Sequence, residues 1–138
     1  PYTTLFRSYA EEAEVELTAN TESSLFHADE AKMIRILVNL ITNAIKFSPP
    51  GGKVQVESHL NGIEIEFKVK DQGPGIAEEM QEAIFNRFQQ AGLSKRRGKA
   101  GFGLGLAISK AFAEMHGGRL WVESDGKNGS VFVLRIPL

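Results

Sequence analysis

The sequence predicts an α+β domain whose helices pack on one face of a mixed, mostly antiparallel sheet. Two segments, about residues 29–47 and 103–116, carry the features of long helices. Two further regions contain paired strand-like segments, and one pair is joined by Asn61-Gly62, the strongest short signal for a β-hairpin. Helices and adjacent antiparallel hairpins in this order favour helices packed against one face of a sheet.

Composition limits the function classes before any motif is considered. A chain of 138 residues with 42% apolar and 24% charged residues is typical of one globular domain. It has no cysteine, which excludes disulfides, thiolate zinc sites and cysteine nucleophiles, and its net charge of −1 gives no support to nucleic-acid binding. The longest apolar run, residues 131–134, is too short for a membrane span, and no signal peptide is visible. We therefore expect a cytoplasmic domain that contacts neither nucleic acid nor membrane.

The shorter elements follow from local pattern. Val15 and Leu17 alternate with polar residues as in a half-buried strand, whereas residues 1–8 carry little pattern and resemble a ragged start. Four further strands are expected, together with one short helix and one mobile loop that is polar, basic and patternless. The strands are residues 53–60, 63–70, 119–123 and 130–137, the short helix is 78–85, and the loop is 89–100.

The first long helix, which Asp29 can cap and residues 48–52 break, has two different faces. Four apolar residues at helical spacing form a stripe that we expect to face the core: Ile34, Leu37, Ile41 and Ile45. Asn39, Asn43 and Lys46 lie within about 60° of one another on the opposite side. An asparagine amide oxygen suits Mg²⁺ and a lysine can reach a phosphate. The alternative is a solvated helix face on which two asparagines occur by chance.

A glycine-rich turn follows the second strand of the hairpin: Asp71-Gln72-Gly73-Pro74-Gly75-Ile76. The carboxylate of Asp71, at the end of a strand, can accept a hydrogen bond from an exocyclic amine such as that of adenine. The glycines let a backbone and a ligand approach closely, because no Cβ intervenes. The alternative is an ordinary strand-ending turn, since Asp, Gly and Pro are common turn residues.

A second glycine-rich segment, residues 101–106, opens the second long helix. The unpaired N–H groups and the positive end of such a helix start favour an anion, and most often a phosphate. The spacing G-x-G-x-G after a basic loop excludes a Rossmann site, and the P-loop, D-F-G and H-R-D motifs are absent from the sequence. Four cations in the preceding loop suit a lid over a triphosphate: Lys95, Arg96, Arg97 and Lys99. The alternatives are close helix–sheet packing for the glycines and a solvated basic loop.

Together these segments resemble the ATP-binding catalytic domain of sensor histidine kinases, within the wider GHKL superfamily, over about residues 29–138. Four stretches are similar to the N, G1, F and G2 boxes of the family: residues 39–47, 71–76, 84–88 and 101–106. Residues 116–124 are similar to its closing strand signature. The resemblance implies the Bergerat ATP-binding fold, an α/β sandwich with three helices on one face of the sheet. It also implies that residues 89–100 form the ATP lid.

The resemblance further implies ATP and Mg²⁺ as cofactors, and a role for each matching residue. Asn43 would hold Mg²⁺, and Asp71 would bond the adenine amine. Asn39, which would order the metal or phosphates, and Lys46, which would reach a phosphate, are the candidate catalytic residues. The remaining nucleotide-binding residues would pack near the base or cradle the phosphates: Phe47, Gly73, Gly75, Ile76, Gly101, Gly103, Leu104, Gly105 and Leu106.

The first N-box position, Asn39, discriminates among branches of the superfamily. Hydrolysing members and serine kinases usually carry a glutamate there as general base, whereas an amide cannot accept a proton at neutral pH. A neutral histidine nitrogen is already nucleophilic and needs less help. Asn39 therefore favours phosphotransfer to histidine. The alternatives are a stand-alone anti-sigma-type serine kinase and a nucleotide-binding docking module that has lost catalysis.

We expect the acceptor histidine to lie on a partner. None of the three histidines (His27, His59 and His116) sits in a helix resembling the phosphoacceptor motif of the family. The expected partner is the dimerisation and histidine phosphotransfer domain of the same kinase, and indirectly a response regulator. Phe102 and Gln90 depart from the usual hydroxyl residue and arginine of the family, and we expect them to affect nucleotide affinity and rate.

Overall fold

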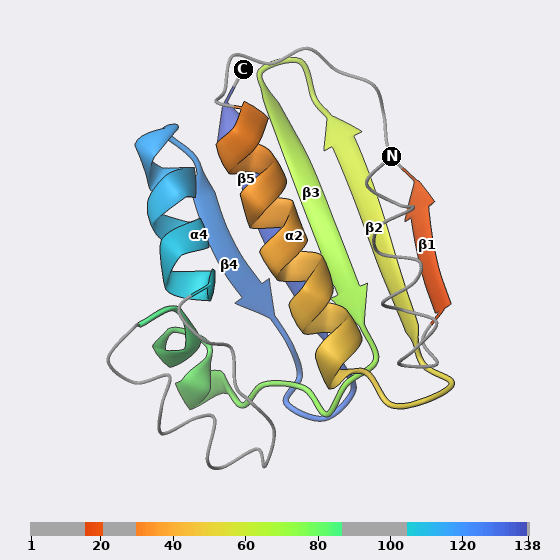
Figure 1. Ribbon diagram of the computed structural model, residues 1–138. Coiled ribbons are helices and arrows are strands. Elements are labelled where there is room, and N and C mark those ends of the chain that lie inside the picture. Colours follow the sequence, from red (N-terminus) through yellow and green to blue (C-terminus); the bar gives the residue numbers. More distant parts are fainter. Residues whose placement is uncertain (1–15, 21–29, 87–104, 138) are drawn as a thin grey trace.

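The structure, a computed structural model, describes residues 16–20, 30–86 and 105–137. Five strands form one sheet in the order β1-β2-β3-β5-β4, and the helices α2 and α4 lie across the same face of it (Figure 1). The elements are β1 Glu16–Asn20, α2 Glu30–Phe47, β2 Lys53–Leu60, β3 Glu64–Asp71, the 3-10 turns η1 Glu78–Met80 and η2 Ala83–Phe85, α4 Gly105–Met115, β4 Arg119–Glu123 and β5 Ser130–Pro137. This arrangement confirms the α+β class and the packing of helices on one face.

The sheet is mixed and mostly antiparallel, as predicted. Strand β1 pairs in parallel with β2, and the other three pairings are antiparallel. Strand β3 begins at Glu64 rather than Ile63, because the side-chain oxygen of Asn61 accepts hydrogen bonds from both of these N–H groups and closes the turn. The register of β3 with β5 places Asp71 opposite Ser130, at one edge of the helix-covered layer.

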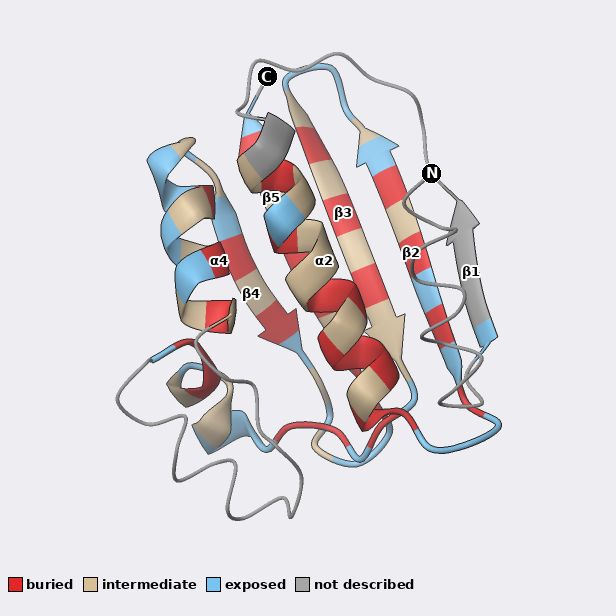
Figure 2. Ribbon diagram, in the orientation of Figure 1, coloured by how far each residue is buried: buried red, intermediate tan, exposed pale blue. Residues whose placement is uncertain are grey.

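The core lies between the sheet and the two helices. In β3, alternate residues are buried against the helices, and Figure 2 shows the resulting alternation along the strand. The buried residues of β3 and β5 on this side are Ile65, Phe67, Val69, Phe132, Leu134 and Ile136. This alternation is what a sheet covered on one face requires.

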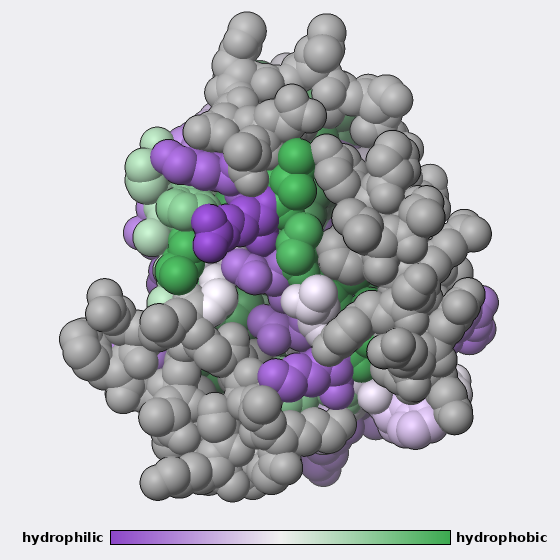
Figure 3. Space-filling model, in the orientation of Figure 1, coloured by the Kyte–Doolittle hydropathy of each residue, from purple (hydrophilic) through white to green (hydrophobic). Residues whose placement is uncertain are grey.

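The buried face of α2 differs from the predicted stripe. The most deeply buried row contains Met33, Ile36, Leu40, Ala44 and Phe47, together with Ile41 and Ile45. Ile34 and Leu37 are only half-buried, because α2 contacts both the sheet and α4 and its apolar arc is wider than one stripe. Figure 3 shows hydrophilic and hydrophobic residues side by side over the visible part of the helical face. Across the described parts of the chain, no helix combines the length and hydrophobicity that a membrane span needs.

The third helical segment consists of two 3-10 turns rather than the α-helix expected over residues 78–85. Ile84 and Phe85 are the buried residues of these turns, and Met80 and Ala83 pack against the core while partly buried. The ring of Phe85 meets that of Phe132 edge-on, with centroids 6.1 Å apart and planes at 73°. This contact holds the segment against the end of the core near β5.

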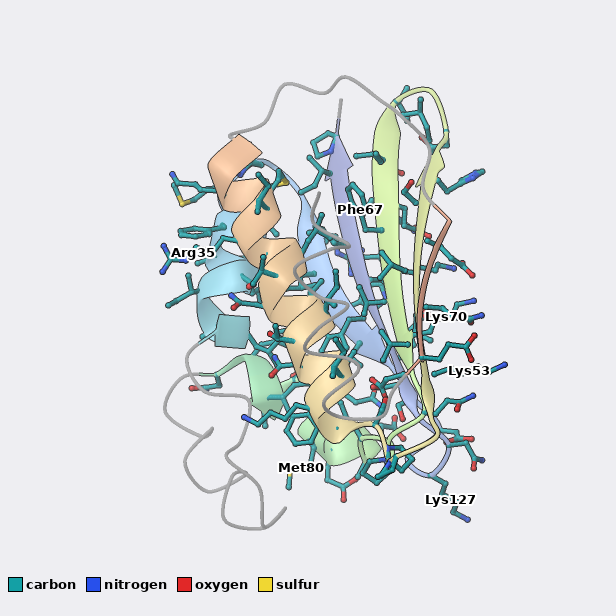
Figure 4. The ribbon with its side chains drawn as sticks, turned by 45° about the vertical axis from the view of Figure 1, so that its right-hand side comes forward. Arg35, Lys53, Phe67, Lys70, Met80 and Lys127 are labelled. Carbon is teal, nitrogen blue, oxygen red and sulfur yellow. The ribbon has the colours of Figure 1, made fainter. Side chains whose placement is uncertain are left out.

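The opposite face of the sheet carries charged side chains that pair with one another. Arg135 donates from Nη2 and Nε to Glu66 Oε2, at 2.7 and 3.1 Å, and its guanidinium lies 5.0 Å from the ring centroid of Trp121. The hydrogen bond from Arg135 holds the pKa of Glu66 below its ordinary value. Figure 4 shows Lys53 and Lys70 pointing away from the helices on this side, whereas Phe67 points toward them.

Candidate functional site

A small cavity lies where the end of α2, the end of β3 and the start of β5 meet, near the lower edge of the sheet in Figure 1. Its volume of about 10 Å³ is roughly the space of one water molecule. The residues that line it are Asn43, Phe47, Asp71, Pro74, Gly75, Ile76, Ser130 and Phe132. Five of them are predicted site residues: Asn43, Phe47, Asp71, Gly75 and Ile76. The fold thus brings together the residues predicted to hold the base and the metal.

Asp71 ends β3 with its carboxylate held by two hydrogen bonds. Its Oδ1 accepts from the backbone N–H of Gly73 at 2.9 Å, and its Oδ2 accepts from the hydroxyl of Ser130 at 2.6 Å. Hydrogen bonds to a charged acceptor are short and strongly directional. These two bonds therefore fix the direction of the carboxylate, as the predicted contact with an adenine amine requires.

Ser130 is a site residue that sequence reasoning missed. It is 5% exposed and lies opposite Asp71 in the pairing of β3 with β5. A Cβ at the preceding residue, Gly129, would overlap the backbone carbonyl of Asp71, so glycine lets the two chain segments meet here. Strand register is the signal that identifies Ser130, because a serine at the start of a strand has no functional pattern of its own.

Gly73 and Gly75 occupy positions where a side chain has no room. A Cβ at Gly73 would lie 2.7 Å from the carbonyl oxygen of Phe47, and one at Gly75 would lie 2.6 Å from the backbone nitrogen of Lys127. Gly75 also has a φ of 82°, a conformation that favours glycine. The turn after β3 is therefore packed between the end of α2 and the β4–β5 loop, which explains both glycines by close approach of backbones.

Two polar side chains fix the same turn from outside. Ser124 Oγ accepts a hydrogen bond from the N–H of Ile76 at 3.0 Å and donates to the carbonyl of Gly129 at 2.7 Å. Gln81 Nε2 donates to the carbonyls of Ile76 and Ser124, at 3.1 and 3.0 Å. These bonds tie one wall of the cavity to the β4–β5 loop and to the segment between η1 and η2. The sequence placed Ser124 within the closing signature without indicating its contacts, and it did not identify Gln81.

Asn43 lines the cavity with an amide that has no hydrogen-bond partner in the described parts of the chain. The residue is 9% exposed. A polar side chain buried to this extent is ordinarily hydrogen-bonded to protein or water. The amide is therefore placed to bond to whatever enters the cavity, and its oxygen is a donor atom that Mg²⁺ accepts.

Asn39, one turn before Asn43, contacts α4. Its Nδ2 donates to the carbonyl of Gly105 at 3.3 Å and to Ser109 Oγ at 3.0 Å. A Cβ at Gly105 would lie 3.2–3.4 Å from the atoms of the Asn39 amide, so glycine lets the first turn of α4 pack on this side chain. The polar face predicted for α2 is therefore partly buried between the two helices.

Lys46 and Phe47 end α2 beside the cavity. Phe47 is buried and belongs to the core, and its contact with a base stays a prediction. Lys46 is half-buried, and its Nζ lies 5.8 Å from the ring centroid of Phe47. The phosphate contact of Lys46 stays a prediction.

Helix α4 begins at Gly105, and the side chain of Leu106 is fully buried. Leu106 can therefore offer an anion only its backbone N–H, one of the unpaired groups of a helix start. The other predicted phosphate residues lie outside the described residues: Gly101, Gly103 and Leu104. The same holds for the lid at 89–100, for the basic residues in it, for the departures Gln90 and Phe102, and for residues 1–8.

The described residues contain no group of three or more His, Cys, Asp or Glu side chains suited to a metal ion. Of the oxygens that line the cavity, those of the Asp71 carboxylate accept hydrogen bonds from Gly73 and Ser130, whereas the amide oxygen of Asn43 is a neutral ligand of the kind that Mg²⁺ accepts. Mg²⁺ usually keeps several waters and takes one or two protein ligands beside substrate phosphates. This donor set fits a metal that arrives with a nucleotide.

Two of the histidines fall within the described residues, and neither lines the cavity. His116, just after α4, has its Nδ1 2.7 Å from the carbonyl oxygen of Phe112. His59 lies exposed on β2.

Residues 28–138 match the sequence profile of the family described as histidine kinase-, DNA gyrase B- and HSP90-like ATPases, and the chain belongs to this family. Among its relatives, the circadian input-output histidine kinase CikA of Synechococcus elongatus is 41% identical over 123 residues. The match covers 89% of this chain and 16% of CikA. The chain therefore spans about a sixth of the length of this relative.

Solved structures place the chain in the histidine kinase branch of the family. The catalytic domain of histidine kinase ThkA has a TM-score of 0.83 and 29% identity, over 99% of this chain and 88% of that one. Full-length ShkA in complex with AMPPNP has a TM-score of 0.81 and 30% identity, over 99% and 28%. ThkA in complex with the response regulator TrrA has a TM-score of 0.77 and 27% identity, over 99% and 38%.

Proposed function

We propose that this chain binds ATP with Mg²⁺ and transfers the γ-phosphate to a histidine on a dimerisation and phosphoacceptor domain outside the chain. The observation that carries the proposal is the convergence of two groups on one cavity. One is the oriented carboxylate of Asp71, and the other is the amide of Asn43, which has no hydrogen-bond partner among the residues that the structure describes. The likeness to ShkA, solved with AMPPNP, supports a nucleotide site in this fold.

Four of the residues that line the cavity have distinct tasks in this function. Asp71 accepts a hydrogen bond from the adenine amine, while Phe47 and Ile76 provide apolar contacts for the ring. Asn43 holds Mg²⁺ through its amide oxygen, and the N–H groups at the start of α4 bind phosphate oxygens. Bound Mg²⁺ supplies charge neutralisation for the triphosphate and its transition state. Lys46 adds a positive charge at the phosphates.

The transfer itself needs little chemistry from the protein. A neutral imidazole nitrogen of the partner histidine bonds to the γ-phosphorus, the bond to the bridging oxygen breaks, and ADP leaves. The proton on the other imidazole nitrogen then passes to water. Asn39 has no basic group to take this proton, and its amide is engaged with α4. Catalysis therefore rests on positioning and on charge neutralisation.

We further propose that the phosphate passes from the partner histidine to a response regulator. ThkA, which has the same fold, has been solved in complex with the response regulator TrrA. Because the reaction consumes ATP, we assign this domain to the cytoplasm, whether or not the rest of the kinase is anchored in a membrane.

The experiment that tests the function uses γ-labelled ATP and two candidate acceptors. One is a purified two-helix domain with a single phosphoacceptor histidine, and the other is a serine-bearing protein. An acid-labile label on the helical domain supports histidine phosphotransfer, whereas an acid-stable label on the serine protein alone would overturn it. Asp71→Asn should abolish the label, and Glu79→Gln, a matched change at an exposed carboxylate on η1, should not.

A further inference from the structure

Ser109 is a buried hydroxyl beside the site to which the proposed function gives no task. It is 0% exposed, inside α4 and one turn after Gly105. Its Oγ lies 3.0 Å from Nδ2 of Asn39 on α2. A buried hydroxyl costs free energy unless it is hydrogen-bonded. The hydrogen bond with Asn39 therefore offsets the cost of burying Ser109 and links the two helices.

The Gly105 carbonyl decides which end of the Asn39 amide faces α4, and the Ser109 hydroxyl adds a second hydrogen bond that holds the amide in that orientation. The two hydrogens of Nδ2 go to the Gly105 carbonyl and to Ser109 Oγ. A flipped amide would set Oδ1 against the Gly105 carbonyl, which can only accept. In the described parts of the chain, Oδ1 of Asn39 has no hydrogen-bond donor of its own. Ser109 and Gly105 thus hold the amide with its oxygen available.

We propose that Ser109 is a positioning residue that keeps the oxygen of Asn39 available to the nucleotide-bound divalent cation and its waters. Asn39 and Asn43 are four residues apart on α2, so they lie on the same helix face. Held this way, both amides offer a neutral oxygen on one side of the helix. Without Ser109, one of the two bonds is lost, and the Gly105 carbonyl alone holds the amide, which is then less firmly oriented. The inference rests on the proposed binding of Mg²⁺ with a nucleotide.

The test compares nucleotide binding by Ser109→Ala with and without Mg²⁺, using AMPPNP in a calorimetric titration. We expect metal-free affinity to stay unchanged and the enhancement by Mg²⁺ to fall roughly tenfold, as is typical when a ligand loses its outer-shell partner. Ser58→Ala is the matched control, because Ser58 is also buried but lies on β2 and does not line the cavity. It should leave the enhancement unchanged.

A second measurement needs no nucleotide. The side-chain amide protons of Asn39, identified by their loss in Asn39→Asp, should exchange slowly with solvent in the wild-type chain. Exchange should be faster in Ser109→Ala and unchanged in Ser58→Ala. Ser109→Thr keeps the hydroxyl and should restore slow exchange. Thermal unfolding of each variant establishes that it is folded.

The outcomes separate this inference from the function on which it rests. Wild-type chain that fails to bind AMPPNP would overturn the proposed function, and the metal role of Ser109 with it. If the wild type binds but Ser109→Ala keeps the full Mg²⁺ enhancement, the positioning role alone is wrong. Equal weakening with and without Mg²⁺ would also overturn it, because that result indicates a packing role.

Discussion

The carboxylate of Asp71 shows how single hydrogen bonds prepare this site. The hydroxyl of Ser130 and the N–H of Gly73 hold one oxygen each. Asp71→Asn keeps the shape of the side chain but removes its charge and replaces one acceptor with a donor. We expect the affinity for AMPPNP to fall at least about tenfold, since a hydrogen bond to a charged group contributes roughly 1.5–3 kcal/mol. Calorimetric titration measures this, and unchanged affinity in a folded variant would contradict the assignment of Asp71.

The Glu66–Arg135 ion pair, on the face of the sheet away from the site, should make the free energy of unfolding depend on pH. Arg135 lowers the pKa of Glu66 in the folded state. A lowered pKa stabilises the fold above the unfolded-state pKa, and this contribution is lost as the pH falls through the folded-state pKa. Glu66→Gln should therefore lower the free energy of unfolding at pH 7 by about 0.5–1 kcal/mol, because the pair is partly open to solvent.

Urea unfolding of the wild type and of Glu66→Gln at several pH values checks the direction of this pH dependence. The difference between them should shrink as the pH falls below about 4.3, the ordinary pKa of glutamate. Nucleotide binding should be the same in both, since the pair lies outside the cavity. A difference that stays constant down to low pH would show that the pair acts through packing.

At the scale of elements, the turn after β3 is set by its neighbours as much as by its own sequence. Gly75→Ala would combine a φ of 82° with a Cβ 2.6 Å from the backbone nitrogen of Lys127. Gly62 has a similar φ of 94°, but nothing lies within 4 Å of its Cβ position. Gly62→Ala should cost about 1–2 kcal/mol of unfolding free energy, the penalty of a left-handed residue. Gly75→Ala should cost clearly more.

Chemical denaturation of the two alanine variants gives the comparison. Because the backbone conformations are similar, the difference between their unfolding free energies isolates the contact of the turn with the β4–β5 loop. Equal losses would mean that this loop does not support the turn.

The ends of helices and strands were predictable where the sequence contains turn-forming residues. The side of a helix that faces the core was harder to predict. Asn61-Gly62 and the prolines after Phe47 marked the ends of strands and of α2 to within a residue. The buried face of α2 was predicted only in part, since Ile41 and Ile45 are buried as expected whereas Ile34 and Leu37 are half-buried, because apolar residues occupy two adjacent rows and α4 packs against α2. The short helix expected over residues 78–85 is present as two 3-10 turns, in which Ile84 and Phe85 are buried.

The residues of the candidate site were likewise predictable only in part from the sequence. Asn43, Asp71 and Gly75 were predictable because their chemistry is visible in short local motifs. Their partners were not, because the hydrogen bonds join residues far apart in sequence: 59 positions for Ser130 and Asp71, and 70 for Asn39 and Ser109. Only strand register and helix packing bring such pairs together.

At the scale of the whole molecule, the fold separates a covered face from an open one. Helices cover one side of the sheet, and the cavity lies where α2, β3 and β5 meet. On the open side, opposite charges pair along and between strands, as in Lys70 with Glu57 at 3.2 Å.

A ligand that binds only the folded state raises its stability by about 2.7 kcal/mol at a hundred times its Kd. Mg²⁺ and AMPPNP together should therefore raise the Tm of the wild type by more than that of Asp71→Asn.

The most direct measurement is a calorimetric titration of the folded wild-type chain and of Asn43→Ala with AMPPNP, in the presence and absence of Mg²⁺. We predict saturable one-to-one binding by the wild type that strengthens with Mg²⁺, and binding by Asn43→Ala that Mg²⁺ does not strengthen. Absence of binding by the wild type, or full strengthening by Mg²⁺ in Asn43→Ala, would contradict the assignment of the residues around this cavity to a Mg²⁺–ATP site.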